Sequence, residues 1–137
     1  MLQRDYLLRE IEKMGAITNA IRQKILGGND NLAFTLENQI EQTKGMLLNE
    51  TNFDLDKFLD LGIEKSNEYI CSFEGFSVEN IEVLAEYLSQ IGFNEKCDNS
   101  RKYLAKALQL NELCNLKSKT YSFERATNIQ AIKDVLQ

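Results

Sequence analysis

The sequence contains no histidine, no tryptophan and no proline. Without histidine, the chain has no Ser-His or Cys-His nucleophile pair, no imidazole general base and no imidazole ligand for a metal ion. Proline makes up roughly 5% of an average chain and is concentrated in turns and loops, so its absence indicates short connections between helices. We therefore expect a protein that is not an enzyme and that uses no cofactor and no metal ion.

Cysteine is also scarce, and the three cysteines stand far apart at Cys71, Cys97 and Cys114. An odd number with no close Cys-Cys spacing argues against a disulfide framework and against a thiolate zinc site. Unpaired cysteine is among the most buried residue types, so we expect three buried free thiols. The sequence leaves open whether any of them is reactive.

Long apolar runs are absent, and charged residues interrupt the N-terminal segment. The 137 residues carry 16 basic and 21 acidic side chains, a net charge of −5. This length predicts one domain over residues 1–137. The charge argues against a nucleic-acid partner because phosphates would be repelled. Without a membrane-spanning or export segment, we expect a cytoplasmic protein with no membrane contact.

Acidic residues are concentrated between residues 29 and 75, where ten face only three lysines. A cation site at Asp54, Asp56 and Asp60 is one interpretation. The run, however, lacks the glycine and the terminal glutamate of a calcium-binding loop. We therefore expect a solvated helix face, and the sequence does not say whether this segment binds anything.

Apolar residues recur at steps of three and four through most of the chain, which is typical of helices that bury one face. No stretch alternates long enough to form a strand, and there is no Asn-Gly or Asp-Gly hairpin signal. The sequence therefore predicts an all-α fold of six or seven helices.

Five of the seven glycines stand where a periodicity stops, as residues that end helices do. The expected N-caps are Asp30, Asp54, Ser77 and Ser122. The first five expected helices cover residues 4–26, 31–48, 55–61, 64–73 and 78–91. The sixth begins at Asn94 or Asp98 and ends near residue 114. The last helix is expected to face inward with Phe123, Ala126, Ile129, Ile132 and Leu136.

Residues 77–113 form a helix pair whose small residues, Ala85, Ala105 and Ala107, stand where two antiparallel helices would approach closely. With Leu84-Ala85, Gly92 and Ala107-Leu108-Gln109-Leu110, the pair resembles a tetratricopeptide repeat. It departs from that family in having Glu112 where the usual proline stands. The resemblance implies antiparallel helix pairs stacked in a right-handed array. The first helix of each such pair lines the concave side, so we expect Glu82, Glu86, Tyr87 and Gln90 to bind a partner.

The opening Arg4-Asp5-Tyr6-Leu7-Leu8-Arg9-Glu10-Ile11-Glu12 is similar to the start of a family of short bacterial helical proteins, a resemblance that implies no activity. The long first helix, within residues 1–28, has an apolar stripe wider than one neighbour would cover. We therefore expect a protein–protein interaction module that binds another protein or a peptide. The alternatives are a homodimer that uses Leu8, Ile17 and Ile21 as its contact and, less favoured, a small enzyme that works through carboxylates or a cysteine.

Overall fold

Every regular element in the described parts of the chain is an α-helix, as the sequence predicts. The computed structural model describes the backbone of residues 2–27, 33–94 and 97–137, and the side chains of residues 4–23, 36–94 and 97–137. The expected N-cap Asp30 and the expected helix stop at Gly28 lie outside these ranges. Within them, the helices are α1 (Leu2–Gly27), α2 (Ala33–Thr51), α3 (Leu55–Asp60), α4 (Ile63–Cys71), α5 (Val78–Gly92), α6 (Ser100–Ser118) and α7 (Phe123–Leu136).

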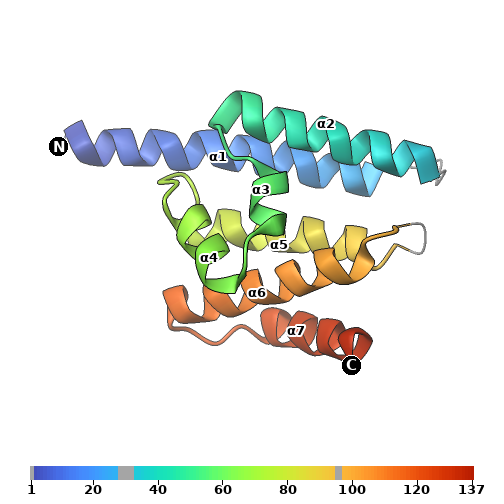
Figure 1. Ribbon diagram of the computed structural model, residues 1–137. Helices are drawn as coiled ribbons and strands as arrows, with labels where there is room; N and C mark the ends of the chain where they lie inside the picture. Colours follow the sequence, from blue (N-terminus) through green and yellow to red (C-terminus); the bar gives the residue numbers. More distant parts are fainter. Residues whose placement is uncertain (1, 28–32, 95–96) are drawn as a thin grey trace.

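The five long helices lie side by side in the order α2, α1, α5, α6, α7, and neighbouring helices run antiparallel except for α1 and α5, which run parallel (Figure 1). Helices α3 and α4 are short and cross the front of this layer, where both contact α6. The antiparallel pairing of α5 and α6 places the expected helix pair as predicted. A right-handed array of the tetratricopeptide type stays a prediction.

Local capping fixes where three of the helices begin. The side chains of Asp54, Ser77 and Ser122 each accept a hydrogen bond from a backbone N–H three residues later, at 3.1, 3.3 and 3.1 Å. Such a bond satisfies one of the backbone donors that the first turn of a helix leaves without a partner. These three predicted caps are confirmed. Helix α6 instead begins at Ser100, after Asn99, whose side chain makes no capping bond.

The core follows the predicted apolar face of α5. Its residues Ile81, Leu84, Ala85, Leu88 and Ile91 are all buried. Helix α6 is buried around most of its circumference because α5, α7, α3 and α4 all contact it. Of the small residues expected between the two helices, Ala85 and Ala107 are buried and Ala105 is exposed. The buried apolar residues form one cluster that includes members from all seven helices.

Gly75 and Gly92, near helix ends, provide space for neighbouring segments, and none of the described glycines forms a left-handed cap, which corrects the sequence-based interpretation. None of the described glycines has a positive φ, whereas Asn52 and Lys119 do, at 65° and 58°. A Cβ on Gly75 would lie 2.7 Å from the carbonyl oxygen of Glu10 in α1. A Cβ on Gly92 would lie 2.6 Å from Leu104 Cγ. Both glycines therefore allow neighbouring segments to approach closely.

The expected inward face of α7 is wrong at Phe123, which is exposed, whereas Ile132 is buried. A helix turns by about 100° per residue, so positions nine residues apart lie on opposite sides. Phe123 and Ile132 therefore cannot share one face. Arg125, which the sequence analysis did not select, takes the inward position in the first turn of α7.

Candidate interaction surface

The expected partner-binding residues on α5 do not form an open surface, because α1 and α6 pack against this helix. Tyr87 is only 2% exposed, and Gln90 is half-buried. The carboxylate of Glu82 accepts a bond from Arg125 at 3.1 Å, and that of Glu86 accepts one from Arg22 at 2.9 Å. Tyr87 is therefore not available to a partner, and Glu82 and Glu86 join helices to one another. Binding of a partner through Glu82, Glu86 and Gln90 stays a prediction.

The three residues expected in a contact between subunits lie at different depths on α1. Leu8 is exposed, Ile17 packs partly buried against the core, and Ile21 is 1% exposed. Ile21 is therefore not available for such a contact. Near Leu8, the side chains of Tyr6 and Leu7 are also exposed, on the part of α1 that extends beyond α2 (Figure 1).

The acidic residues considered as a cation site have separate structural roles. Asp54 caps α3, Asp56 pairs with Lys44 at 2.8 Å, and Asp60 pairs with Lys102 at 2.5 Å. The hydrogen bond and the charge of Lys102 lower the pKa of Asp60 below its ordinary value. The described residues contain no group of three or more acidic or cysteine side chains placed to hold a metal ion.

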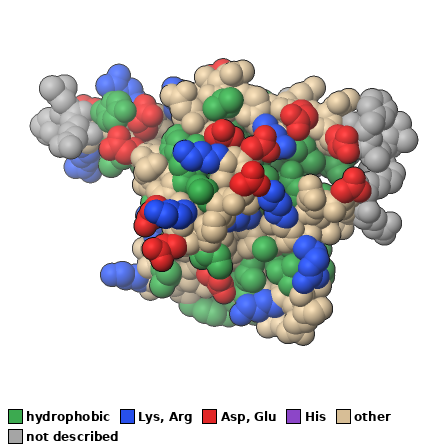
Figure 2. Space-filling view, in the orientation of Figure 1, with side chains coloured by type: hydrophobic (Ala, Val, Ile, Leu, Met, Phe, Trp, Pro, Cys, Tyr) green, Lys and Arg blue, Asp and Glu red, His purple; other side chains and the backbone are tan. Residues whose placement is uncertain are grey.

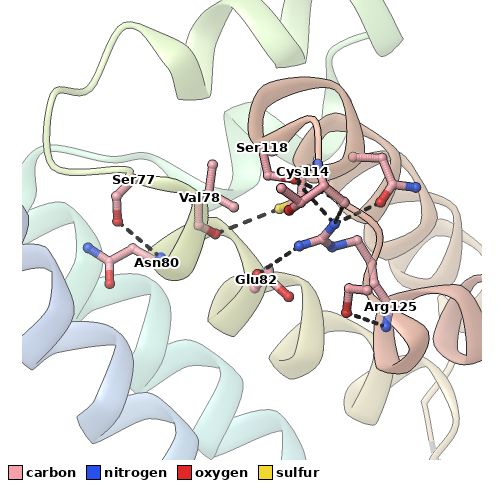
Figure 3. A network of polar contacts seen from close by, with 10 residues as sticks. Ser77, Val78, Asn80, Glu82, Cys114, Ser118 and Arg125 are labelled. Atoms are coloured by element: carbon pink, nitrogen blue, oxygen red, sulfur yellow. Dashed lines mark hydrogen bonds and ion pairs between the residues drawn. The ribbon is translucent and has the colours of Figure 1, made fainter.

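The cysteines differ in burial, so the expectation of three buried thiols holds only for Cys114. Cys71 is exposed and Cys97 is partly buried. Burial raises the pKa of Cys114 to about 12, and its thiol lies 3.7 Å from the carbonyl oxygen of Val78 (Figure 3). Burial also raises the pKa of Cys97.

Lys106 is a buried cation that the sequence analysis missed. Its ammonium donates hydrogen bonds to the carbonyl oxygen of Leu61 at 2.6 Å and to Ser66 Oγ at 2.9 Å, and it lies 5.2 Å from the centre of the Phe58 ring. Burial lowers the pKa of Lys106 below its ordinary value. These bonds connect α6 to the turn between α3 and α4, so the role of Lys106 is structural.

A second buried cation, Arg125, joins three parts of the chain (Figure 3). It is 5% exposed. Its Nη2 donates to Glu82 on α5 at 3.1 Å, and its Nη1 donates to Asn115 Oδ1 on α6 at 2.8 Å. Its backbone N–H also donates to Ser122, the cap of α7. Arg125 therefore fixes the connection between α6 and α7 from the inside.

In the residues just before Arg125 in the sequence, three large apolar side chains are exposed to solvent. Leu116, Tyr121 and Phe123 are 73, 79 and 75% exposed, the highest values among the large hydrophobic side chains of the described residues. Ser122 has an extended backbone and uses its side chain as the cap. We call Leu116, Tyr121 and Phe123 the α6–α7 corner.

The charged residues between Leu116 and Phe123 are basic, and an exposed acidic residue, Glu124, follows directly after Phe123. Between Leu116 and Phe123 the chain carries Lys117 and Lys119, both exposed, and no acidic residue. Hydrophobic side chains reach the surface in both the upper and the lower parts of the view in Figure 2, and acidic side chains are more frequent in the upper part. The corner therefore combines apolar side chains with positive charge on a protein of net charge −5.

Comparison of the chain with protein-family models, with curated proteins and with solved structures finds no match in any of the three. The resemblances to tetratricopeptide repeats and to short bacterial helical proteins stay predictions. Among the helices of the described ranges, none has a stretch both long and apolar enough to cross a membrane.

Proposed function

We propose that this chain is a non-enzymatic protein–protein interaction module that binds its partner through the α6–α7 corner. The observation that carries the proposal is the position of Leu116, Tyr121 and Phe123. These three most exposed large apolar side chains of the described residues lie within eight positions of one another. Exposed apolar groups gathered at one place are typical of a surface that another protein covers.

The network around Arg125 supports this role because it holds the corner in one conformation. Lys119 adopts a left-handed backbone conformation, and the guanidinium of Arg125 lies near the carbonyl oxygen of Thr120. A surface that is already ordered loses little conformational entropy when it binds. Large aromatic side chains on such a surface are frequent binding hot spots.

The chemistry of the corner defines the partner. Leu116, Tyr121 and Phe123 require an apolar surface, and Lys117 and Lys119 favour carboxylates at its edge. We therefore propose a protein or peptide partner whose apolar face is bordered by acidic residues. A cytoplasmic location belongs to this proposal, since the three cysteines are free thiols and a reducing compartment keeps thiols free.

The tetratricopeptide-like arrangement is also part of the proposal. The antiparallel pair of α5 and α6, with Gly92 at a close approach to Leu104, supports it. In such an array α7 would lie where the first helix of a following pair stands. The partner surface that we propose is then the end of the array rather than its concave side.

The test is recovery of a partner with the full chain and two variants. The double variant with Tyr121→Ser and Phe123→Ser removes the aromatic rings, and Ile63→Ser is the matched control because Ile63 is 69% exposed on α4. A partner identified by mass spectrometry, bound by the wild type and by Ile63→Ser and at least about tenfold weaker with the double variant, is expected. Equal recovery with both variants, or no partner with the wild type, overturns the proposal.

A second candidate function is self-association through α1. The side chains of Tyr6, Leu7 and Leu8 are exposed on the part of α1 that extends beyond α2 (Figure 1). Light scattering of the wild type and of Leu8→Asp tests it. A dimer that Leu8→Asp dissociates supports this function, and a wild-type monomer at high concentration excludes it.

A further inference from the structure

A cavity of about 210 Å³ lies between α2 and the beginning of α6, at a distance in sequence and structure from the α6–α7 corner. Its apolar part is formed by Leu36 and Ile40, one helical turn apart on α2. Its polar part includes Glu37 from α2, Asp98 from the segment before α6, and Tyr103 from the first turns of α6. The cavity has room for a small molecule or for one side chain of another protein.

The negative charge in this cavity is only partly balanced. Lys44 also lines the cavity, and its ammonium bonds to Asp56 at 2.8 Å and to Glu41 at 3.3 Å. Neither Glu37 nor Asp98 forms an ion pair with any residue that the structure describes. The first N–H groups of α6 contribute roughly half a positive charge at this edge, which is less than one of these carboxylates carries. The cavity therefore favours a cation.

Tyr103 adds a polar group to the same cavity. Its side chain is 6% exposed, and its hydroxyl has no hydrogen-bond partner among the described residues. The hydroxyl oxygen is not among the fully buried polar atoms, so it can be reached from the cavity that Tyr103 lines. A ligand in the cavity that donates a hydrogen bond would provide a partner for the Tyr103 hydroxyl. A metal ion would make no apolar contact with Leu36 and Ile40, whereas an organic cation would.

We propose that this cavity binds an organic cation, an ammonium or guanidinium group on a short alkyl stem. The cation lies between the carboxylates of Glu37 and Asp98 and donates a hydrogen bond to Tyr103 Oη, and the stem packs against Leu36 and Ile40. Two sources share this chemistry: a free alkylamine, and a lysine or arginine side chain of a partner protein.

Titration calorimetry of the full chain with methylamine, ethylamine, propylamine and butylamine tests the proposal. Because each buried methylene contributes apolar contact, the dissociation constant is expected to fall about fourfold per carbon. Binding that does not depend on stem length, or no saturable binding of butylamine, overturns the proposal.

Blocked lysine and blocked arginine, N-acetylated and amidated, form the second arm of the titration. If they bind as tightly as butylamine, the source is a partner side chain, and if the cavity excludes them, it is a free amine.

Two pairs of substitutions separate this site from general attraction of cations to an acidic protein. The double variant Glu37→Gln and Asp98→Asn is expected to weaken butylamine binding about tenfold or more. The control Glu64→Gln and Glu68→Gln removes the same charge from exposed positions on α4 and is expected to leave binding unchanged. Equal weakening by both pairs contradicts the site. All four positions are exposed, so the fold is retained.

Discussion

The guanidinium of Arg125 on α7 donates a 3.1 Å hydrogen bond to the carboxylate of Glu82 on α5, 43 residues earlier in the chain. Arg125 is buried, and the side chain of Glu82 is about one-third exposed. The remaining partners of Arg125 are neutral oxygens of α6 and of the α6–α7 connection. Glu82 is therefore the ionic partner that balances this buried charge.

Replacement of Glu82 by Gln should destabilise the protein by about 2 kcal/mol, because it leaves a buried guanidinium without a counter-charge. The control is Glu86→Gln, which breaks a pair with Arg22 whose side chains are both more than one-third exposed. That change should cost less than about 1 kcal/mol. Urea unfolding of the two variants measures the difference, and equal losses of stability would show that the Arg125 network does not hold the corner.

Glycine positions give a second prediction with an internal control. Gly75→Ala places a Cβ 2.7 Å from a backbone oxygen of α1 and should cost about 1–3 kcal/mol. Gly45→Ala lies in α2 with nothing within 4 Å of the added Cβ, and should stabilise the protein by about 0.5–1 kcal/mol. The midpoint temperature of thermal unfolding should therefore fall in Gly75→Ala and rise in Gly45→Ala, relative to the wild type. A loss of stability in Gly45→Ala would contradict the packing described for α2.

The sequence predicts what is decided locally and misses what is decided between distant segments. The caps Asp54, Ser77 and Ser122 were predictable because each bonds to a residue three positions later. The partners of Arg125 and Lys106 were not, since an arginine or lysine in a sequence carries no mark of burial. One signal was overlooked, because the nine-residue spacing from Phe123 to Ile132 already placed them on opposite sides of α7.

The pair of Asp60 and Lys102 predicts an acid-dependent change in stability. Lys102 lowers the pKa of Asp60 in the folded protein below the ordinary value of 3.8. A carboxyl with a lowered folded pKa contributes stability above its unfolded pKa, and this contribution disappears as the pH falls through the folded pKa. NMR titration should show the Asp60 pKa below 3.8 in the wild type and close to it in Lys102→Met. Identical titration curves would contradict the ion pair.

Thiol chemistry should distinguish Cys71 from Cys114. At pH 8 an exposed Cys71 should react rapidly with an aromatic disulfide reagent. Cys114, whose pKa burial raises to about 12, has a thiolate fraction of about one in ten thousand at that pH and should react only after unfolding. Cys71→Ser should remove the fast phase. Rapid labelling of Cys114 in the folded protein would show that α5 and α6 open.

The most direct test of the α6–α7 corner as a binding surface is photo-crosslinking inside cells that express the full chain. A benzophenone amino acid replaces Tyr121 in one version and Ile63 in the other, so that two highly exposed positions in different segments of the chain are compared. We predict a discrete adduct with one protein from position 121 and no adduct with it from position 63. The same products from both positions, or none from position 121, would contradict the account.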